Sequence, residues 1–266
     1  MSLGIVIKGP EGLVLAADSR ITLQAKPVGG HPGVNVNYDT ATKLLSFSKP
    51  NTAVGVVTYG QALIGIRTAH SYIPEFEASL PPERLSISDF AGRFSDFYAN
   101  QFQSQMPGYK GPDMHFVVGG FNEDEPYGRV FEIKMPSSPT PVEHQAAPGD
   151  FGITWGGQRE IVDRLLQGYD HRLPDILRAA LKLTPKQQKV LLQELEPLRM
   201  LLPLQALPLQ DCVDLAIFFI RTTISAQNLV VGLRGVGGPI EVATVTRREG
   251  LQFVQQKRIV GESQPR

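Results

Sequence analysis

Ser2 combines a residue type and a position that could support catalysis. A side chain this small permits removal of the initiator methionine, after which Ser2 would carry a hydroxyl and a free α-amine. An α-amine titrates near ~8, so a modest downward shift of its pKa gives a neutral base at cellular pH. One residue could then supply nucleophile and general base together. Serine is also a common second residue, so the assignment depends on the sequence that follows.

An apolar run, a Pro-Glu-Gly turn and a second apolar run lead from Ser2 to Asp18 and Arg20. Two apolar runs joined by such a turn predict a hairpin buried on both faces. The stretch resembles the opening of a proteasome β-type subunit, which begins at its nucleophile and reaches a strand that ends in Ala-x-Asp-x-Arg. With Ser2 as the first mature residue the match has no gap, whereas retention of Met1 shifts the register by one.

Lys43 begins the next apolar run, after a Pro- and Gly-rich stretch at 24–41 for which we predict a long loop. In the resembled family, a lysine at the start of the third strand lies beside the nucleophile and a carboxylate holds it in place. Its charge lowers the pKa of neighbouring groups. The resemblance therefore implies that Ser2, Asp18 and Lys43 act in catalysis and that Arg20 supports the site.

The segment at 57–62, Val-Thr-Tyr-Gly-Gln-Ala, resembles the part of the family that supplies the oxyanion hole from a backbone N–H. The alignment places the family's donor glycine at Val57 or Thr58. A backbone donor does not depend on the side chain. The predicted oxyanion donors are the N–H groups of Thr58 and Tyr59.

The resemblance covers residues 2–160 and 207–255, including a last core strand entered from the glycine pair at 237–238. The chain departs from the family in three places. Serine replaces the usual threonine at the nucleophile, which removes the methyl group that restricts the rotamer. The family's supporting serine and aspartate are missing from the corresponding stretches at 155–158 and 225–228. These departures indicate a divergent bacterial proteasome homologue.

Other enzyme classes leave no signature in the sequence. The histidines at 31, 70, 115, 144 and 171 have no metal-ligand spacing, and phosphate-loop, dinucleotide-binding and Gly-x-Ser-x-Gly motifs are absent. We therefore predict no cofactor and no metal. Lys and Arg number 26, as do Asp and Glu, so nothing in the charge balance indicates a nucleic-acid partner.

Cysteine content and hydropathy predict a cytoplasmic protein. Cys212 is the single cysteine, so no internal disulfide can form, and its apolar surroundings predict a buried structural thiol. The first residues lack the basic region of a secretory signal, and no apolar stretch is long enough to span a membrane.

The remaining pattern predicts runs of strands that alternate with runs of helices. Strands are expected at 43–47, 52–57, 115–120, 129–133, 240–246 and 251–254, and helices at 61–73, from Ser86 onward, and from 157 to 227. We predict an α+β fold in which antiparallel sheets form a four-layer αββα sandwich, as the resemblance implies. Residues 1–266 would form a single proteasome-like domain.

A stretch punctuated by five prolines at about 169–208 is predicted to be a helical insertion. Its leucines at 201, 202, 204, 207 and 209 could form a small local core or an apolar patch that contacts a neighbour. Both interpretations stay open on the sequence alone.

The leading hypothesis is a peptide or protein amide-bond hydrolase that uses Ser2. The resemblance implies assembly into a homo-oligomeric ring, and the sequence names no activator or ATPase partner. Two alternatives remain: a non-catalytic ring-forming scaffold on the same fold, or a small-molecule amidase. No nucleic-acid or membrane partner is expected.

Overall fold

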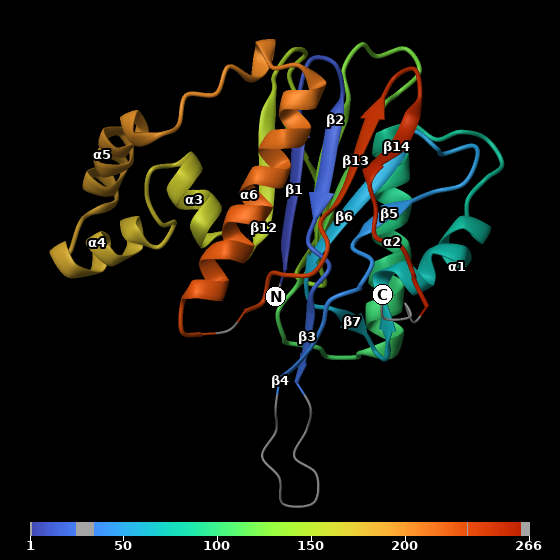
Figure 1. The fold of residues 1–266 in the computed structure, drawn as a ribbon, viewed down its shortest axis with the longest axis horizontal. Coiled ribbons are helices and arrows are strands. Elements are labelled where there is room, and N and C mark those ends of the chain that lie inside the picture. Colours follow the sequence, from blue (N-terminus) through green and yellow to red (C-terminus); the bar gives the residue numbers. More distant parts are fainter. Residues whose placement is uncertain (1, 25–34, 233, 262–266) are drawn as a thin grey trace, which may run out of the picture.

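Two five-stranded antiparallel sheets form the centre of the molecule in the computed structural model, which describes residues 2–24, 35–232 and 234–261 (Figure 1). The first sheet has the order β12-β1-β2-β13-β14. Its strands are β1 (Leu3–Lys8), β2 (Leu13–Ala17), β12 (Gly152–Gly157), β13 (Glu241–Thr246) and β14 (Gly250–Gln255). The second sheet has the order β11-β10-β9-β6-β5. Its strands are β5 (Leu44–Ser46), β6 (Val54–Gly60), β9 (Met114–Gly120), β10 (Arg129–Met135) and β11 (Ser138–His144).

Helices cover the outer face of each sheet. The second sheet carries α1 (Ile73–Ala78) and α2 (Ile87–Gln105), and the first carries α3 (Glu160–Leu166) and α6 (Leu209–Leu229). Between α3 and α6 the chain forms α4 (Leu173–Leu181) and α5 (Pro185–Leu195), which lie at the margin of the molecule (Figure 1). Short 3₁₀ turns lie at Ala69–Tyr72, Glu196–Leu198 and Leu204–Ala206. Two small hairpins complete the described fold: β3 (Ile21–Gln24) with β4 (Asn35–Tyr38), and β7 (Leu63–Ile64) with β8 (Arg67–Thr68).

Buried apolar side chains form three clusters, one at each interface between layers. Strand β1 shows why, since Leu3, Ile5 and Ile7 face the helices while Val6 faces the second sheet. Both faces of this strand are buried, so its sequence is apolar from Leu3 to Ile7 and does not alternate with polar residues. The three interfaces make the molecule an αββα sandwich, and the predicted α+β fold is confirmed.

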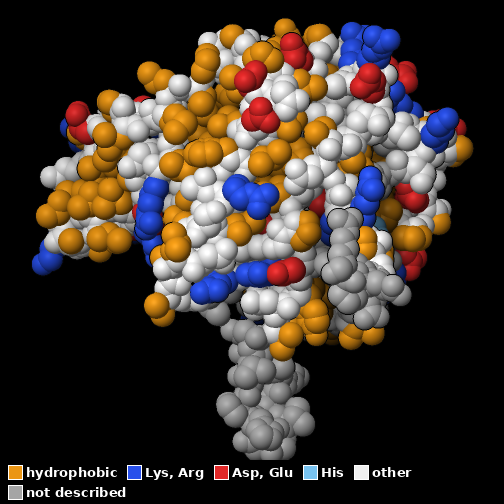
Figure 2. Space-filling view, in the orientation of Figure 1, with side chains coloured by type: hydrophobic (Ala, Val, Ile, Leu, Met, Phe, Trp, Pro, Cys, Tyr) orange, Lys and Arg blue, Asp and Glu red, His pale blue; other side chains and the backbone are white. Residues whose placement is uncertain are grey.

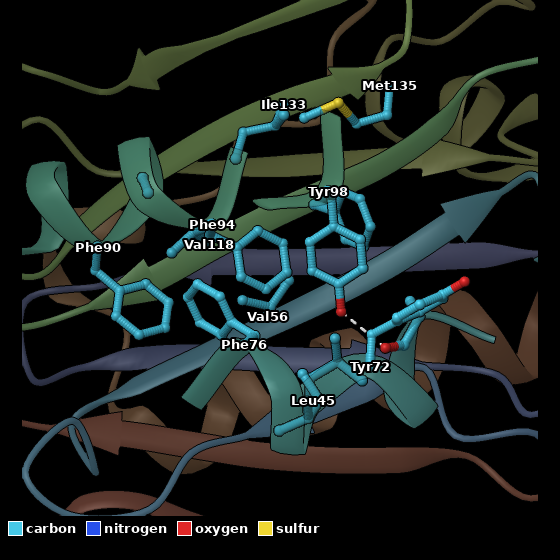
Figure 3. Packing of buried hydrophobic residues seen from close by; sticks show 14 of the residues in the cluster. Leu45, Val56, Tyr72, Phe76, Phe90, Phe94, Tyr98, Val118, Ile133 and Met135 are labelled. Atoms are coloured by element: carbon cyan, nitrogen blue, oxygen red, sulfur yellow. Dashed lines mark hydrogen bonds between the residues drawn. The ribbon is translucent and has the colours of Figure 1, made fainter. Parts of the chain in front are cut away.

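The helix-covered face of the second sheet is dominated by aromatic rings (Figure 3). Ser86 caps the N-terminus of α2 by accepting a hydrogen bond from the Asp89 N–H at 3.1 Å. Phe90, Phe94 and Tyr98 then repeat at helical spacing and are fully buried. The Tyr98 hydroxyl donates to the Ala69 carbonyl at 2.7 Å, which satisfies the one polar atom in this stripe.

Two local predictions were wrong, and some strands were missed. Residues 61–68 form the β7–β8 hairpin and not the start of a helix. The expected loop at 24–41 contains β4, which pairs with β3, although residues 25–34 lie outside the described residues. Strands β11 and β12 were not predicted at all. No helix among the described residues is both long and apolar enough to cross a membrane.

Replacing Phe94 by alanine should lower the free energy of unfolding by about 3–5 kcal/mol, because it leaves a cavity within the aromatic cluster. Denaturant unfolding followed by circular dichroism measures this change. The matched control is Phe218→Ala, since Phe218 is 48% exposed and its truncation should cost less than about 1 kcal/mol. Equal losses in the two variants would contradict the assignment of the core.

Candidate active site

Asp18 is completely buried at the end of β2, and both of its carboxylate oxygens are fully used. Oδ1 accepts hydrogen bonds from the Leu3 N–H at 3.0 Å and from Lys43 Nζ at 2.7 Å. Oδ2 accepts from the backbone N–H groups of Arg20 at 3.1 Å and Gly237 at 2.9 Å. One carboxylate therefore joins the start of β1, the end of β2, the lysine before β5 and the loop before β13.

Lys43 lies in the same buried place, with a side chain only 4% exposed. Its ammonium donates to Asp18 and to the Arg20 carbonyl. Burial lowers the pKa of Lys43 below its usual value, while the Asp18 carboxylate opposes that shift. The pair thus places a desolvated cation next to the first strand.

Ser2 precedes β1 and is buried beside this ion pair. Its carbonyl accepts a hydrogen bond of 2.7 Å from the N–H of Gln158, which follows β12. Gly157 permits this approach, because it has a φ of +97° and a Cβ there would come within 1.9 Å of the Ser2 carbonyl oxygen. The neighbouring strand end therefore fixes the position of Ser2.

Ser2 and Lys43 line the same cavity, which has a volume of about 20 Å³. This volume holds about one water molecule. The structure thus brings together three of the four residues predicted to be catalytic. The other residues that line the cavity come from β3, the segment before β5, the end of β6, the β7–β8 region and β9: Ile21, Ala41, Thr42, Thr58, Tyr59, Gln61, Ala62, Thr68, Ala69 and Met114.

Arg20, the fourth predicted residue, points away from Ser2 toward the loop before β13. Its guanidinium makes two hydrogen bonds with Asp39, at 2.5 and 2.7 Å, and donates to the Arg234 carbonyl at 3.1 Å. Only its backbone reaches the Asp18–Lys43 pair. Its side chain therefore holds the segments that surround the pair and does not line the cavity.

The strand pairing decides which backbone donors at the end of β6 are free. The Thr58 N–H donates to the Lys43 carbonyl at 2.9 Å, so it is already used. Hydrogen bonds between Ala53 and Phe121 and between Gln61 and Asp113 set the alternation with β9, which directs the Tyr59 N–H toward His115.

The same alternation directs the Gly60 N–H to the side of Lys43, beyond the end of β5. Gly60 has a φ of +89°, and a Cβ there would come within 2.3 Å of the Asp113 carbonyl oxygen, so only glycine fits. The sequence pattern predicted Thr58 and Tyr59 and missed Gly60. The glycine itself was the signal, because it is the one glycine in the segment at 57–62.

The Tyr59 ring lies across the paired glycines Gly4 and Gly156, where a Cβ on either would contact it. The ring stacks on His115 at 4.9 Å between centroids, and the Tyr59 hydroxyl donates to Glu132 at 3.3 Å. Burial raises the pKa of the Tyr59 phenol, which keeps it neutral and a donor. This side chain closes the space between the two sheets below Ser2.

Two glutamines occupy the stretches in which the family's serine and aspartate were missing. The Gln227 side-chain amide donates to the Gln158 side-chain oxygen at 2.6 Å, and the Gln227 oxygen accepts from the Val236 N–H at 3.0 Å. Since the Gln158 backbone holds Ser2, these amides support the position of Ser2 with neutral groups. Within the described ranges, no group of three His, Cys, Asp or Glu side chains is arranged to hold a metal ion.

The described residues adopt the N-terminal-nucleophile hydrolase fold, and the start of β1 packs against the buried Asp18–Lys43 pair. No protein-family model matches the chain, and no curated protein is similar to it in sequence. Solved structures share its fold. A Gly-1 mutant of Anbu from Hyphomicrobium sp. strain MC1 has a TM-score of 0.55 and 16% identity, over 97% of this chain and 88% of that one.

Anbu, described as an ancestral beta-subunit, from Yersinia bercovieri has a TM-score of 0.54 and 15% identity over 96% of this chain and 88% of that one. A further structure of Anbu from Hyphomicrobium sp. strain MC1 has a TM-score of 0.54 and 16% identity over 97% of this chain and 87% of that one. At this identity the likeness defines the fold, which is that of the proteasome-like protein Anbu.

Replacing Asp18 by asparagine should lower the free energy of unfolding by about 3–5 kcal/mol, because it leaves Lys43 buried without its counter-ion. Adding Lys43→Met in the same protein should recover part of that loss. Chemical denaturation of the single and double variants measures both effects.

The control is Asp175→Asn, in an exposed pair with Arg178, where a change of at most about 0.5 kcal/mol is expected. A double variant no more stable than Asp18→Asn alone would show that the unpaired lysine is not the cause of the loss.

Proposed function

We propose that this protein is an N-terminal-nucleophile hydrolase that cleaves amide bonds in peptides, with Ser2 as its nucleophile once Met1 is removed. The observation that carries the proposal is the buried Lys43–Asp18 ion pair, whose lysine lines the same cavity as Ser2. Buried charges are costly and are frequently found where they shift the pKa of reacting groups.

In this mechanism the Ser2 hydroxyl attacks the substrate carbonyl carbon and its proton passes to the Ser2 α-amine. The cavity has room for one water molecule, which could relay that proton. The Lys43 cation favours the alkoxide form of Ser2 by lowering the pKa of its hydroxyl, and Asp18 orients Lys43. The amine then returns the proton to the leaving nitrogen, and water hydrolyses the acyl-enzyme.

We assign the oxyanion donor to the Gly60 N–H. It lies on the Lys43 side of β6, whereas the Thr58 N–H is already bonded to the Lys43 carbonyl and the Tyr59 N–H faces β9. A fixed backbone donor at this place can stabilise the negative charge of the tetrahedral intermediate.

We expect substrate entry to involve a local rearrangement, because the described cavity of about 20 Å³ is smaller than a peptide side chain. The β7–β8 hairpin and the residues before it form one wall, so this is the segment that we expect to move. We further propose a single domain in which 169–208 is a helical insertion, assembly into a homo-oligomeric ring, and action in the cytoplasm on peptides or proteins.

One observation favours the alternative of a non-catalytic scaffold on the same fold. Where the resembled family has a serine and an aspartate, this chain has the amides Gln158 and Gln227, and an amide cannot stabilise a charged amine as well as a carboxylate. A protein that retains Met1 would have no free amine on Ser2 and would fit this alternative. A monomer that hydrolyses small amides would instead indicate the amidase hypothesis.

Intact-mass measurement of the purified protein should give a value lower than the full sequence by one methionine. Replacement of Ser2 by alanine should then lower kcat/KM for a fluorogenic peptide at least ~1,000-fold while the unfolding transition stays the same. Ser104→Ala is the matched control, since Ser104 is exposed on α2. Retention of Met1, or full peptidase activity in Ser2→Ala, would rule out the catalytic proposal.

A further inference from the structure

A cavity of about 1090 Å³ runs along β12 and shares no residue with the cavity at Ser2. One wall is the strand itself, at Gly152, Ile153 and Trp155. The opposite wall is the segment 193–205, which includes the end of α5 and the leucines that follow it. We call this cavity the β12 groove.

Strand β12 is an edge of the first sheet, and three of its residues line the groove. The Gln158–Ser2 hydrogen bond sets the alternation with β1, so residues 152, 154 and 156 bond to β1. The N–H and C=O groups of Ile153 and Trp155 therefore point outward. Among the described residues, none is hydrogen-bonded to these outer groups, which leaves a template for an added strand.

The wall opposite β12 is apolar and exposed. Leu201 is 94% exposed and Met200 is 41% exposed. Figure 2 shows hydrophobic side chains gathered over this side of the molecule, where α4 and α5 lie. The sequence left open whether the leucines at 201–209 form a local core or an exposed patch. The local core is correct for Leu202, Leu204, Leu207 and Leu209, which pack against the buried cluster under α6. Leu201 instead belongs to an exposed patch.

A matching segment lies at the other edge of the same sheet. After β14 the chain continues through Gln256–Gly261, where Ile259 is 104% exposed and Val260 is 80% exposed. Arg258 in the same segment is exposed and forms no ion pair with a described residue. Asp150, which lines the groove, is exposed and likewise has no ion-pair partner in the described part of the chain. The aliphatic side chains and the exposed cation of this segment therefore complement the exposed Leu201 and Asp150 of the groove.

This segment cannot fill the groove of its own molecule. Lys257 is held by an ion pair with Glu241 at 2.5 Å, so Ile259 reaches only about 7 Å from that point. The sheet has five strands, and its edges are about 19 Å apart at the usual strand spacing. The two features lie on opposite sides of the molecule in Figure 1.

We propose that Gln256–Gly261 of one copy adds as a strand to β12 of the next copy and places an aliphatic side chain against Leu201. The contact is heterologous, because the edge at β14 meets the edge at β12. Repeated contacts of this type close into a ring or extend as a helical filament. Backbone hydrogen bonds would supply affinity, and the groove would select the side chains.

The assembly state tests the two sides of the contact independently. Ile259→Asp/Val260→Asp and Leu201→Asp should each reduce the mass measured by analytical ultracentrifugation to that of the monomer. The matched control Val231→Asp changes a residue that is 106% exposed at the end of α6, and it should leave the mass unchanged. A monomeric wild type, or dissociation by Leu201→Asp but not by Ile259→Asp/Val260→Asp, would overturn the proposal.

Trp155 is the one tryptophan in the sequence and lines the groove, so its fluorescence reports occupancy directly. A synthetic peptide of residues 255–261 should shift the emission of the Ile259→Asp/Val260→Asp protein to shorter wavelength. Adding Leu201→Asp should weaken the apparent Kd at least ~10-fold. A peptide that leaves the emission unchanged would overturn the proposal. Neither measurement depends on peptidase activity, so the outcome is separate from that of the hydrolase proposal.

Discussion

The Asp18 carboxylate is the interaction on which the arrangement of this site depends. Its four hydrogen bonds come from segments that are far apart in the sequence, and the side chain is fully buried. A carboxylate in such a place is stable only if every oxygen is satisfied and a cation lies nearby. The hairpin of β1 and β2, the Lys43 segment and the loop before β13 must all be correctly folded before the charge is tolerated.

This dependence explains how residues that are far apart in the sequence are held in fixed relative positions at the site. The Leu3 N–H is bonded to the same carboxylate as Lys43 Nζ, so the start of β1 and the lysine have a common reference point. On the other side, Gln158 holds the Ser2 carbonyl. Ser2 is thus fixed from β2 through its neighbour and from the end of β12 directly.

Local patterns predicted the parts of the fold that local physics determines. The β1–β2 hairpin and helix α2 follow from apolar runs, a turn and a capped aromatic stripe. The candidate site residues came from the family resemblance, in the register from Ser2 to Asp18, and stay a prediction. Strand β11 escaped because its prolines at 139 and 141 are atypical of strands, and it forms a sheet edge where they are tolerated. Strand β12 escaped because the reasons for its glycines lie in tertiary contacts: Gly156 packs against the Tyr59 ring of the other sheet, and Gly157 lies against the Ser2 carbonyl. Assigning the Gly60 N–H as a donor required knowing which N–H groups of β6 bond to β9 and which face β5, and a sequence does not show this.

Strand β1 connects the Ser2 site to the β12 groove. One of its sides pairs with β2, which ends at Asp18, and the other pairs with β12, whose outer edge lines the groove. The residue that ends β12 precedes Gln158, so any shift of β12 moves the group that holds Ser2. An unpaired edge strand is among the least restrained parts of a sheet, because it lacks hydrogen bonds on one side. An added strand at β12 would therefore restrict the element that positions Ser2, and assembly and nucleophile geometry would then share one strand.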